Sequence, residues 1–309
     1  MKQDRLCLSP PIGGTILEPQ EEKHTGEQHS NPQVVFVTAS NSLYRDVCLY
    51  NAYCAKRYGK FDKVIVYDVD TQISKEYRRE HADIFATKRG AGLWLWKVFF
   101  IEKAFHEECN EGDILFYADA ASFFFRSVKP VISKMKGDIL AVNLPFVEEE
   151  FTKCETFALM ELDSEEYRSS RQFHASFMAF RKNKKTEKFV EEWKHCCEDI
   201  RLLSQDVMFG EQIPSFVAHR NDQSLFSLLC KKYGVHPSED PSQYGITGYG
   251  NYKGAKHLPM KVTKQYPFCI MLHKQRKWNK AEIFKSWLRI YKRYAIIEYR
   301  KIMRREVVI

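Results

Sequence analysis

Short runs of large apolar residues recur along the first half of the chain, and segments with helical periodicity separate them. The runs are VVFVTAS (34–40), KVIVYDV (63–69), DILFYADAAS (113–122) and DILAVNLP (138–145), and an apolar-striped segment, LWLWKVFFIEKAFHEEC (93–109), precedes the third. Strands of a parallel sheet read as continuous apolar runs because helices cover both of its faces. The alternation therefore predicts an α/β fold whose mostly parallel, Rossmann-like central sheet is flanked by helices.

The composition changes at both ends of the chain. Of the 309 residues, 44% are apolar, which suffices for one sizeable core. Residues 1–32 are polar and show no sustained hydrophobic period, which predicts a mobile leader. Residues 281–309 place Ile, Phe, Trp, Leu and Tyr among Lys and Arg at helical spacing, which predicts a basic amphipathic C-terminal helix. We expect a single folded domain over residues 33–280.

The positive charge is concentrated at the C-terminal end. The formal net charge is +8, and residues 281–309 contribute eight Lys or Arg against three Glu, which is +5 of that total. The rest of the chain is nearly neutral, so we expect no nucleic acid partner. The basic helix either binds an anionic membrane surface through its cations and aromatic side chains, or packs on the domain with a solvated basic face.

The cysteines and the hydropathy pattern bear on the compartment. Nine cysteines, an odd number without a Cys-x-x-Cys pair, favour reduced thiols over a disulfide framework. The sequence contains no uncharged apolar stretch of about 18 residues and no N-terminal segment of the signal-peptide type. We therefore expect a cytoplasmic protein that is either soluble or peripheral at a membrane.

One acid, Asp119, ends the third apolar run and lies between Ala118 and Ala120. In open α/β sheets, ligands bind beyond the carboxyl ends of the strands. A carboxylate there can hold Mg²⁺ or Mn²⁺ over a diphosphate, since hard oxygen ligands suit these ions and the ion neutralises the leaving group. The alternative is an acid that caps the following turn, and this residue alone does not separate the two.

A cluster of cations lies in the segment MLHKQRKWNK (271–280). Lys274, Arg276 and Lys277 can stabilise the negative charge that develops on a departing diphosphate. His273, when neutral, is available as a second metal ligand beside Asp119. The alternative is a solvated basic loop.

The segment KRGAGLWLWK (88–97) combines glycines with cations. Its Gly-x-Gly pair lacks the third glycine of a dinucleotide-binding fingerprint. Glycine lets the backbone approach a ligand closely, and Arg89 can make a forked contact with phosphate or sugar hydroxyls, while Lys97 closes the segment. Trp94 and Trp96 lie two residues apart and cannot share one helix face, so we expect one in the core and the other beside a ligand.

Taken in order, these segments resemble the GT-A-type glycosyltransferases, and in particular their retaining family-eight branch. GDILFYADAAS is similar to the apolar strand and Asp-x-Asp of that fold, with Ala121 at the second acid position. QFHASFMAFRKN (172–183) is similar to its middle Asn-Ser-Gly strand, and HRNDQSLFSLLCKKYG (219–234) has the Asp-Gln pair that opens a later helix. Residues 271–280 keep the His, Lys and Trp of its terminal segment but lack the Gly and Pro.

A second resemblance lies upstream. KRGAGLWLWK, followed by Asp-x-x-x-Tyr-x-Asp-Ala, is similar to bacterial and viral glycosyltransferases of polysaccharide and capsule assembly. In that subgroup a small residue often follows Asp-Ala, so Ala121 agrees with it.

The resemblance implies a GT-A-like domain that moves a sugar from a nucleotide diphosphate-sugar, preferably a UDP-sugar, to a glycan or glycolipid acceptor. It implies retention of configuration and a divalent cation, Mn²⁺ or Mg²⁺. The residues it implies are Asp222 and Gln223 for sugar orientation and charge stabilisation; Thr38, Ser40, Arg89, Lys97, Asp119, Lys274 and Lys277 for the donor; Asp119 and His273 for the metal; and Gln172 and His174 for the acceptor. Helix capping is the alternative for Asp222, Thr38 and Ser40.

Two other functions stay open at this point. The missing second acid is compatible with a catalytically silent protein that binds a nucleotide-sugar or a glycan. A sugar nucleotidyltransferase of the same broad fold is disfavoured, because the first strand leads into TASNS (38–42) and not into a glycine-rich, basic triphosphate loop.

Overall fold

The computed structural model describes residues 31–250, 254–260, 263 and 265–306, so the predicted leader lies outside the described residues except for its last two positions. The strands are β1 Val34–Ser40, β2 Lys63–Asp68, β3 Ile114–Ala118, β4 Ser122–Phe124, β5 Ile139–Leu140, β6 Asn143–Val147, β7 Arg171–Phe173, β8 Phe177–Arg181 and β9 Ile270–Leu272. The helices are α1 Arg45–Cys54, α2 Lys75–Glu80, α3 Ala82–Phe85, α4 Gly90–Leu93, α5 Leu95–Glu107, α6 Lys129–Ile132, α7 Glu148–Phe151, α8 Cys154–Leu159, α9 Glu165–Arg168, α10 Lys184–Glu198, α11 Ile200–Leu203, α12 Asp222–Lys232, α13 Tyr244–Thr247 and α14 Lys280–Glu306. A 3₁₀ turn (η1, Ser42–Tyr44) precedes α1, and a π-helical turn (η2, Ala55–Gly59) follows it.

The central sheet has five strands in the order β2-β1-β3-β8-β5. Strand β1 is parallel to both β2 and β3, whereas β8 is antiparallel to both β3 and β5. Four of the five strands therefore run in one direction, and the predicted mostly parallel sheet is confirmed. Two short antiparallel pairs, β4-β9 and β6-β7, lie outside this sheet.

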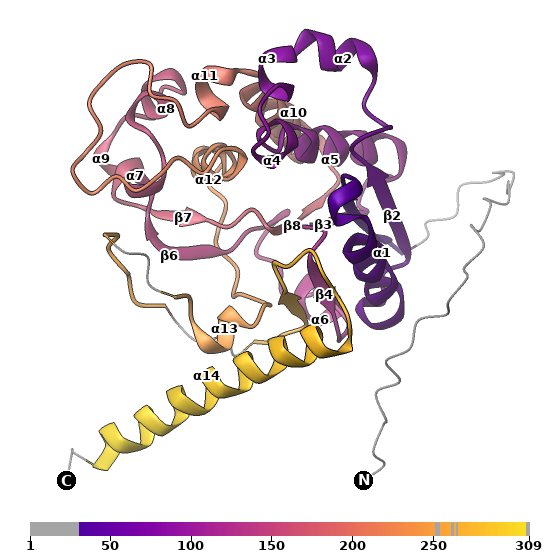
Figure 1. Cartoon of the computed structure of the whole chain (residues 1–309), viewed down its shortest axis with the longest axis vertical. Coiled ribbons are helices and arrows are strands. Elements are labelled where there is room, and N and C mark those ends of the chain that lie inside the picture. Colours follow the sequence, from indigo (N-terminus) through magenta and orange to yellow (C-terminus); the bar gives the residue numbers. More distant parts are fainter. Residues whose placement is uncertain (1–30, 251–253, 261–262, 264, 307–309) are drawn as a thin grey trace, which may run out of the picture.

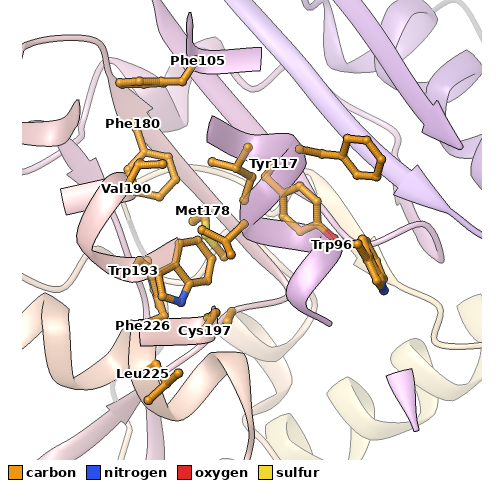
Figure 2. Close-up of a cluster of buried hydrophobic side chains, with 14 of the residues drawn as sticks. Trp96, Phe105, Tyr117, Met178, Phe180, Val190, Trp193, Cys197, Leu225 and Phe226 are labelled. Carbon is orange, nitrogen blue, oxygen red and sulfur yellow. The ribbon is translucent and has the colours of Figure 1, made fainter. Parts of the chain in front are cut away.

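The sheet is covered on both faces, because alternate residues of its central strands enter two different cores. In β1, Val35 and Val37 belong to one buried cluster, and Val34 and Phe36 to the other. Helices α5, α10 and α12 pack on the first face, and Figure 2 shows the part of this cluster where Trp193 meets side chains of β8 and α12. Helix α1, the β4-β9 pair and the start of α14 cover the second face.

Helix α14 lies across one end of the domain, beside α13, and its C-terminal part extends beyond the body (Figure 1). Ile283 belongs to the second core, and the Trp287 ring lies 4.9 Å from the Phe125 ring. The predicted C-terminal helix is therefore present, and its first turns are docked. Within the described residues, no helix combines the length and the apolar character needed to cross a membrane.

Candidate functional site

A cleft of about 390 Å³ opens at the carboxyl ends of β1 and β3. Its walls come from the end of β1 and η1, the turn before α5, the segment after β3, and the segment after β9. The lining residues are Ala39, Ser40, Asn41, Leu43, Tyr44, Lys88, Gly90, Ala91, Trp94, Trp96, Asp119, Ala120, Ala121, Ser122, Ser176, Leu272, Lys274 and Arg276. The cleft thus lies where a doubly wound sheet places a ligand, and Asp119 is in it.

The charged side chains of the cleft are mostly positive. Lys88 enters from the turn before α5, and Lys274 and Arg276 enter from the segment after β9. Asp119 is the one carboxylate among the described lining residues. Three cations around a single acid suit a ligand with more than one negative charge.

The segment before α5, which consists of α4 and Trp94, has a left-handed backbone over five consecutive residues. The φ angles from Gly90 to Trp94 are +60°, +52°, +95°, +52° and +64°. A left-handed conformation costs an L-residue about 1–2 kcal/mol, so this backbone is strained where it borders the cleft. A Cβ on Gly90 would lie 2.5 Å from the Trp94 ring, and the Gly90 carbonyl accepts a hydrogen bond of 2.8 Å from Trp96 Nε1.

Both tryptophans of this segment line the cleft, whereas the sequence predicted one. Helix α5 begins at Leu95, so Trp94 lies on the left-handed turn and the helical spacing rule does not apply to the pair. Together with Tyr44, they give the cleft three aromatic surfaces on which a planar ring can stack.

Beneath the cleft, Lys97 joins two acids that are far apart in the sequence. Its Nζ lies 2.7 Å from Asp222 Oδ2 and 3.4 Å from Asp119 Oδ1, and it donates a 3.1 Å hydrogen bond to the Ala175 carbonyl. Tyr117 donates its hydroxyl to the same Asp119 oxygen at 3.0 Å. The structure therefore brings together three residues that the sequence singled out.

The protonation of this cluster follows from its burial. Burial raises the pKa of the Asp222 carboxyl to about 6, although Lys97 opposes the shift. Burial also acts to lower the pKa of the Lys97 ammonium, but Asp119 and Asp222 outweigh it and leave that pKa above its ordinary value. The ammonium therefore stays charged, and Asp222 titrates close to neutral pH.

Asp222 and Gln223 lie behind the cleft and not in its lining. The Asp222 carbonyl accepts from Trp193 Nε1 at 3.2 Å. Gln223 accepts from the Ala175 N–H at 3.4 Å. Asn221 occupies the N-cap position of α12, so the Asp222 side chain faces Lys97 and does not cap its helix.

His273 lies outside the cleft, with its ring against Phe123. A carbonyl only accepts, so His273 Nε2 donates to the Lys277 carbonyl (2.9 Å), and in the neutral ring Nδ1 accepts from the Ser286 hydroxyl (3.0 Å). The lone pair of Nδ1, the one that a neutral His273 ring could offer to a metal ion, is therefore used in a hydrogen bond. The structure does not bring this ring to Asp119.

The predicted acceptor residues are sealed inside the domain. Gln172 is fully buried, donates to Glu148 at 3.1 Å and accepts from Gln223 at 2.8 Å. His174 is 4% exposed, and its Nδ1 has no hydrogen-bond partner in the described part of the chain. Burial holds the pKa of its imidazole well below the ordinary value, so the ring is neutral.

The other predicted donor residues divide between the cleft and its surroundings. Ser40 and Lys274 line it. Thr38 is fully buried, with its hydroxyl 3.7 Å from Cys48 Sγ. Arg89 donates to Asn221 Oδ1 at 3.3 Å, and neither it nor the exposed Lys277 is in the lining.

Several lining residues were missed from the sequence. Lys88 precedes the predicted Arg89 and lines the cleft, whereas the Arg89 side chain bonds Asn221. Tyr44 follows the predicted TASNS segment by two residues and had no distinguishing signal. Ser122 and Ser176 are small polar residues whose roles depend on tertiary contacts alone.

No protein-family model and no curated protein matches the chain. Among solved structures, it is similar to the apo glycosyltransferase GlyE of Streptococcus pneumoniae TIGR4, at 14% identity over 69% of this chain and 48% of that one (TM-score 0.39). It is also similar to mouse xyloside xylosyltransferase 1, at 10% identity over 78% of this chain and 96% of that one (TM-score 0.39). A third is the galactosyltransferase LgtC in complex with donor and acceptor sugar analogs, at 14% identity over 77% of this chain and 86% of that one (TM-score 0.38).

The chain thus spans about half the length of GlyE. All three structures are named as glycosyltransferases, the class that the sequence motifs resemble.

Proposed function

We propose that the chain is a glycosyltransferase that moves a sugar from a nucleotide diphosphate-sugar, preferably a UDP-sugar, to a glycan or glycolipid acceptor. The observation that carries the proposal is the composition of the cleft. Lys88, Lys274 and Arg276 enter it beside aromatic rings, and Asp119 lies at its floor. Such a site offers charge to a diphosphate and stacking surface to a nucleobase.

The cations act on the leaving group. As the bond between the sugar C1 and the diphosphate oxygen breaks, its electron pair passes to the diphosphate, and fixed positive charges stabilise the result. The acceptor hydroxyl forms the new bond to C1 and releases its proton. In a retaining reaction the acceptor approaches from the face that the diphosphate leaves, so a diphosphate oxygen is the nearest base for that proton.

Asp119 orients the donor. Its side chain is 39% exposed, while Oδ1 is held by Tyr117 and Lys97. The carboxylate can accept a hydrogen bond from a sugar or ribose hydroxyl. Asp222 acts through Lys97 and is a positioning residue, and Gln223 supports the backbone at Ala175, whose carbonyl also binds Lys97.

The residues do not fit the Mn²⁺ or Mg²⁺ site that the sequence predicted at Asp119 and His273. The His273 lone pair is used by Ser286, and only Oδ2 of the Asp119 carboxylate is left, because Oδ1 already accepts from an ammonium and a hydroxyl. In the described residues, no three His, Cys, Asp or Glu side chains converge as a metal-binding group would. We therefore assign neutralisation of the diphosphate to the three side-chain cations.

The predicted acceptor residues are less accessible than the residues that line the cleft. Gln172 and His174 are covered, so their contact with an acceptor requires the surrounding segments to move. The unpartnered His174 Nδ1 is the group that gains a hydrogen bond from such an opening.

The exposed apolar face of α14 favours an acceptor that is bound to a membrane. Phe284, Leu288 and Tyr291 are 50–62% exposed and lie along one line of the helix, which is separate from the face that buries Ile283 and Ile290. The exposed cations Lys285 and Lys292 lie beside this apolar line. We assign to this face shallow insertion into an anionic membrane surface.

Donor hydrolysis tests the function. UDP-, GDP- and CMP-sugars are incubated with the full chain, with Mn²⁺ or with EDTA, and nucleotide release is measured. The proposal expects release from a UDP-sugar that EDTA changes by less than about twofold. Binding of a nucleotide-sugar without release of any nucleotide would identify a silent binding protein instead.

A further inference from the structure

A second cavity, of about 300 Å³, lies between α13, β9 and the first turns of α14. Its lining residues are Gln243, Tyr244, Thr247, Met271, Leu272, His273, Lys274, Gln275, Ser286, Arg289, Ile290 and Arg293. Leu272 and Lys274 also line the donor cleft, so the two cavities are adjacent. The proposed glycosyl transfer uses none of the α14 residues in this lining.

The cavity is positively charged. Lys274, Arg289 and Arg293 are its charged side chains, and no Asp or Glu is among its described lining residues. Arg289 and Arg293 are four residues apart on α14 and therefore point the same way. Within the described part of the chain, no acid lies within ion-pair distance of these three cations, whereas Glu282 on the same helix is paired with Lys285 at 2.7 Å.

The wall of the cavity is polar and fixed. Ser286 is 5% exposed, and its hydroxyl accepts from Arg289 Nη2 at 2.8 Å and lies 3.0 Å from His273 Nδ1. The Gln243 side chain is 6% exposed and bonds both the N–H and the carbonyl of Leu272, at 3.0 and 3.2 Å. A ligand would therefore meet donors that are already oriented, which lowers the entropy cost of binding.

We infer that this cavity is a second anion site that binds a phosphate group, separate from the donor diphosphate. Two guanidinium groups with a nearby ammonium match the several acceptor oxygens of a phosphate, and guanidinium forks bind such oxygens in pairs. The phosphate belongs either to a soluble molecule or to the headgroup of a lipid at the α14 surface. The site does not depend on the glycosyl transfer proposed above.

Titration of the full chain with inorganic phosphate, at constant ionic strength against chloride, tests the site by calorimetry. The test variant is Arg289→Gln/Arg293→Gln, and Lys285→Gln/Lys292→Gln is the matched control on the same helix but outside the cavity. We expect saturable binding by wild type and by the control, and a loss of affinity of at least about tenfold in the test variant. Circular dichroism checks folding, and Arg289→Gln alone replaces the double variant if that does not fold.

Two outcomes would overturn the inference. One is unchanged or non-saturable phosphate binding across the three proteins. The other is phosphate binding that Lys88→Gln abolishes and the α14 variant retains, because this places the anion in the donor cleft. Donor hydrolysis is measured separately on the same variants, so a failure of the transferase proposal leaves the titration interpretable.

Vesicles distinguish the two sources of the phosphate. Sedimentation compares binding to phosphatidylcholine alone and to phosphatidylcholine with phosphatidic acid. The control here is Lys134→Gln/Lys136→Gln, which removes two exposed cations outside α14 and outside the cavity. If Arg289→Gln/Arg293→Gln loses the phosphatidate-dependent binding that this control keeps, the ligand is a lipid headgroup. If both variants keep it while only the first loses inorganic phosphate, the ligand is soluble.

Discussion

The ammonium of Lys97 lies 2.7 Å from a carboxylate oxygen of Asp222, with side chains only 4% and 5% exposed. This pair ties the start of α5 to the start of α12, across the core that both helices share. The same ammonium lies 3.4 Å from Asp119 at the floor of the cleft. The position of the partly exposed Asp119 therefore depends on a buried ion pair whose two members do not line the cleft.

Removal of the Lys97 charge is expected to destabilise the protein strongly. Lys97→Met leaves Asp222 buried without its cation, which costs about 3–5 kcal/mol. Asp222→Asn costs less, because Lys97 keeps Asp119 as a partner. Urea unfolding measures both losses, together with that of the double variant Lys97→Met/Asp222→Asn. We predict that the double variant loses less than the sum of the single losses, and strictly additive losses would show that the pair is not coupled.

The pH dependence of stability should report Asp222. Its folded-state pKa of about 6 lies above the ordinary aspartate value of about 4. The folded state therefore binds more protons than the unfolded state between these values, so this group's contribution to stability falls as pH rises from about 4 to about 6 and is constant above.

Other carboxylates add their own slopes, so the informative quantity is the difference between wild type and Asp222→Asn. Urea unfolding from pH 4 to pH 8 should show the free energy of unfolding of wild type falling relative to that of Asp222→Asn as pH rises. The difference should become constant above about pH 6. A difference that is flat across the range would mean that Asp222 titrates normally.

The sequence was sufficient for the sheet but only partly for the site. Continuous apolar runs predict strands covered on both faces, and β1 and β3 have that environment. Asp119 was found because a single acid at the end of a buried apolar run is visible in a sequence, whereas Asp222 and Lys97 followed from the resemblance to known glycosyltransferases. The contact between these residues was not predictable, because the local sequence does not show that α5 and α12 begin beside each other.

Two predictions failed to specify geometry for the same reason. Lys88 and not Arg89 lines the cleft, because the Arg89 side chain donates to Asn221, which is distant in the sequence. The sequence predicts that His273 is a metal ligand, but its Nδ1 lone pair accepts a hydrogen bond from the Ser286 hydroxyl, which comes from α14. Tertiary contacts decide both cases.

Gly90 should be required for the shape of the cleft. Gly90→Ala adds the cost of a left-handed alanine and a collision with the Trp94 ring, which must move. Gly112→Ala is the matched control, because Gly112 also has positive φ but a Cβ there meets nothing within 4 Å. We expect both to lose about 1–2 kcal/mol of stability and only Gly90→Ala to weaken UDP binding, by at least about tenfold. Equal UDP affinities in the two variants would contradict this role.

The exposed face of α14 should bind membranes. Phe284→Ser/Leu288→Ser/Tyr291→Ser removes the apolar line, and each lost apolar contact is worth about 1 kcal/mol or more. Sedimentation with anionic vesicles should show at least a tenfold weaker partition. Leu49→Ser/Met208→Ser is the control, since both side chains are also more than half exposed, at 54% and 64%, but lie elsewhere. Loss of binding in the control as well would mean that exposed apolar area alone, and not α14, drives association.

The rate at which UDP is released from UDP-sugars by wild type and by Lys88→Gln/Arg276→Gln tests whether the cleft is the donor site of a glycosyltransferase. These two cations line the cleft from opposite segments, whereas Lys134→Gln/Lys136→Gln removes the same charge from exposed positions outside it. We predict release by wild type and by the control, and a loss of at least about 100-fold in the cleft variant. Release that the cleft variant retains in full, or no release by wild type from any UDP-sugar, would contradict this prediction.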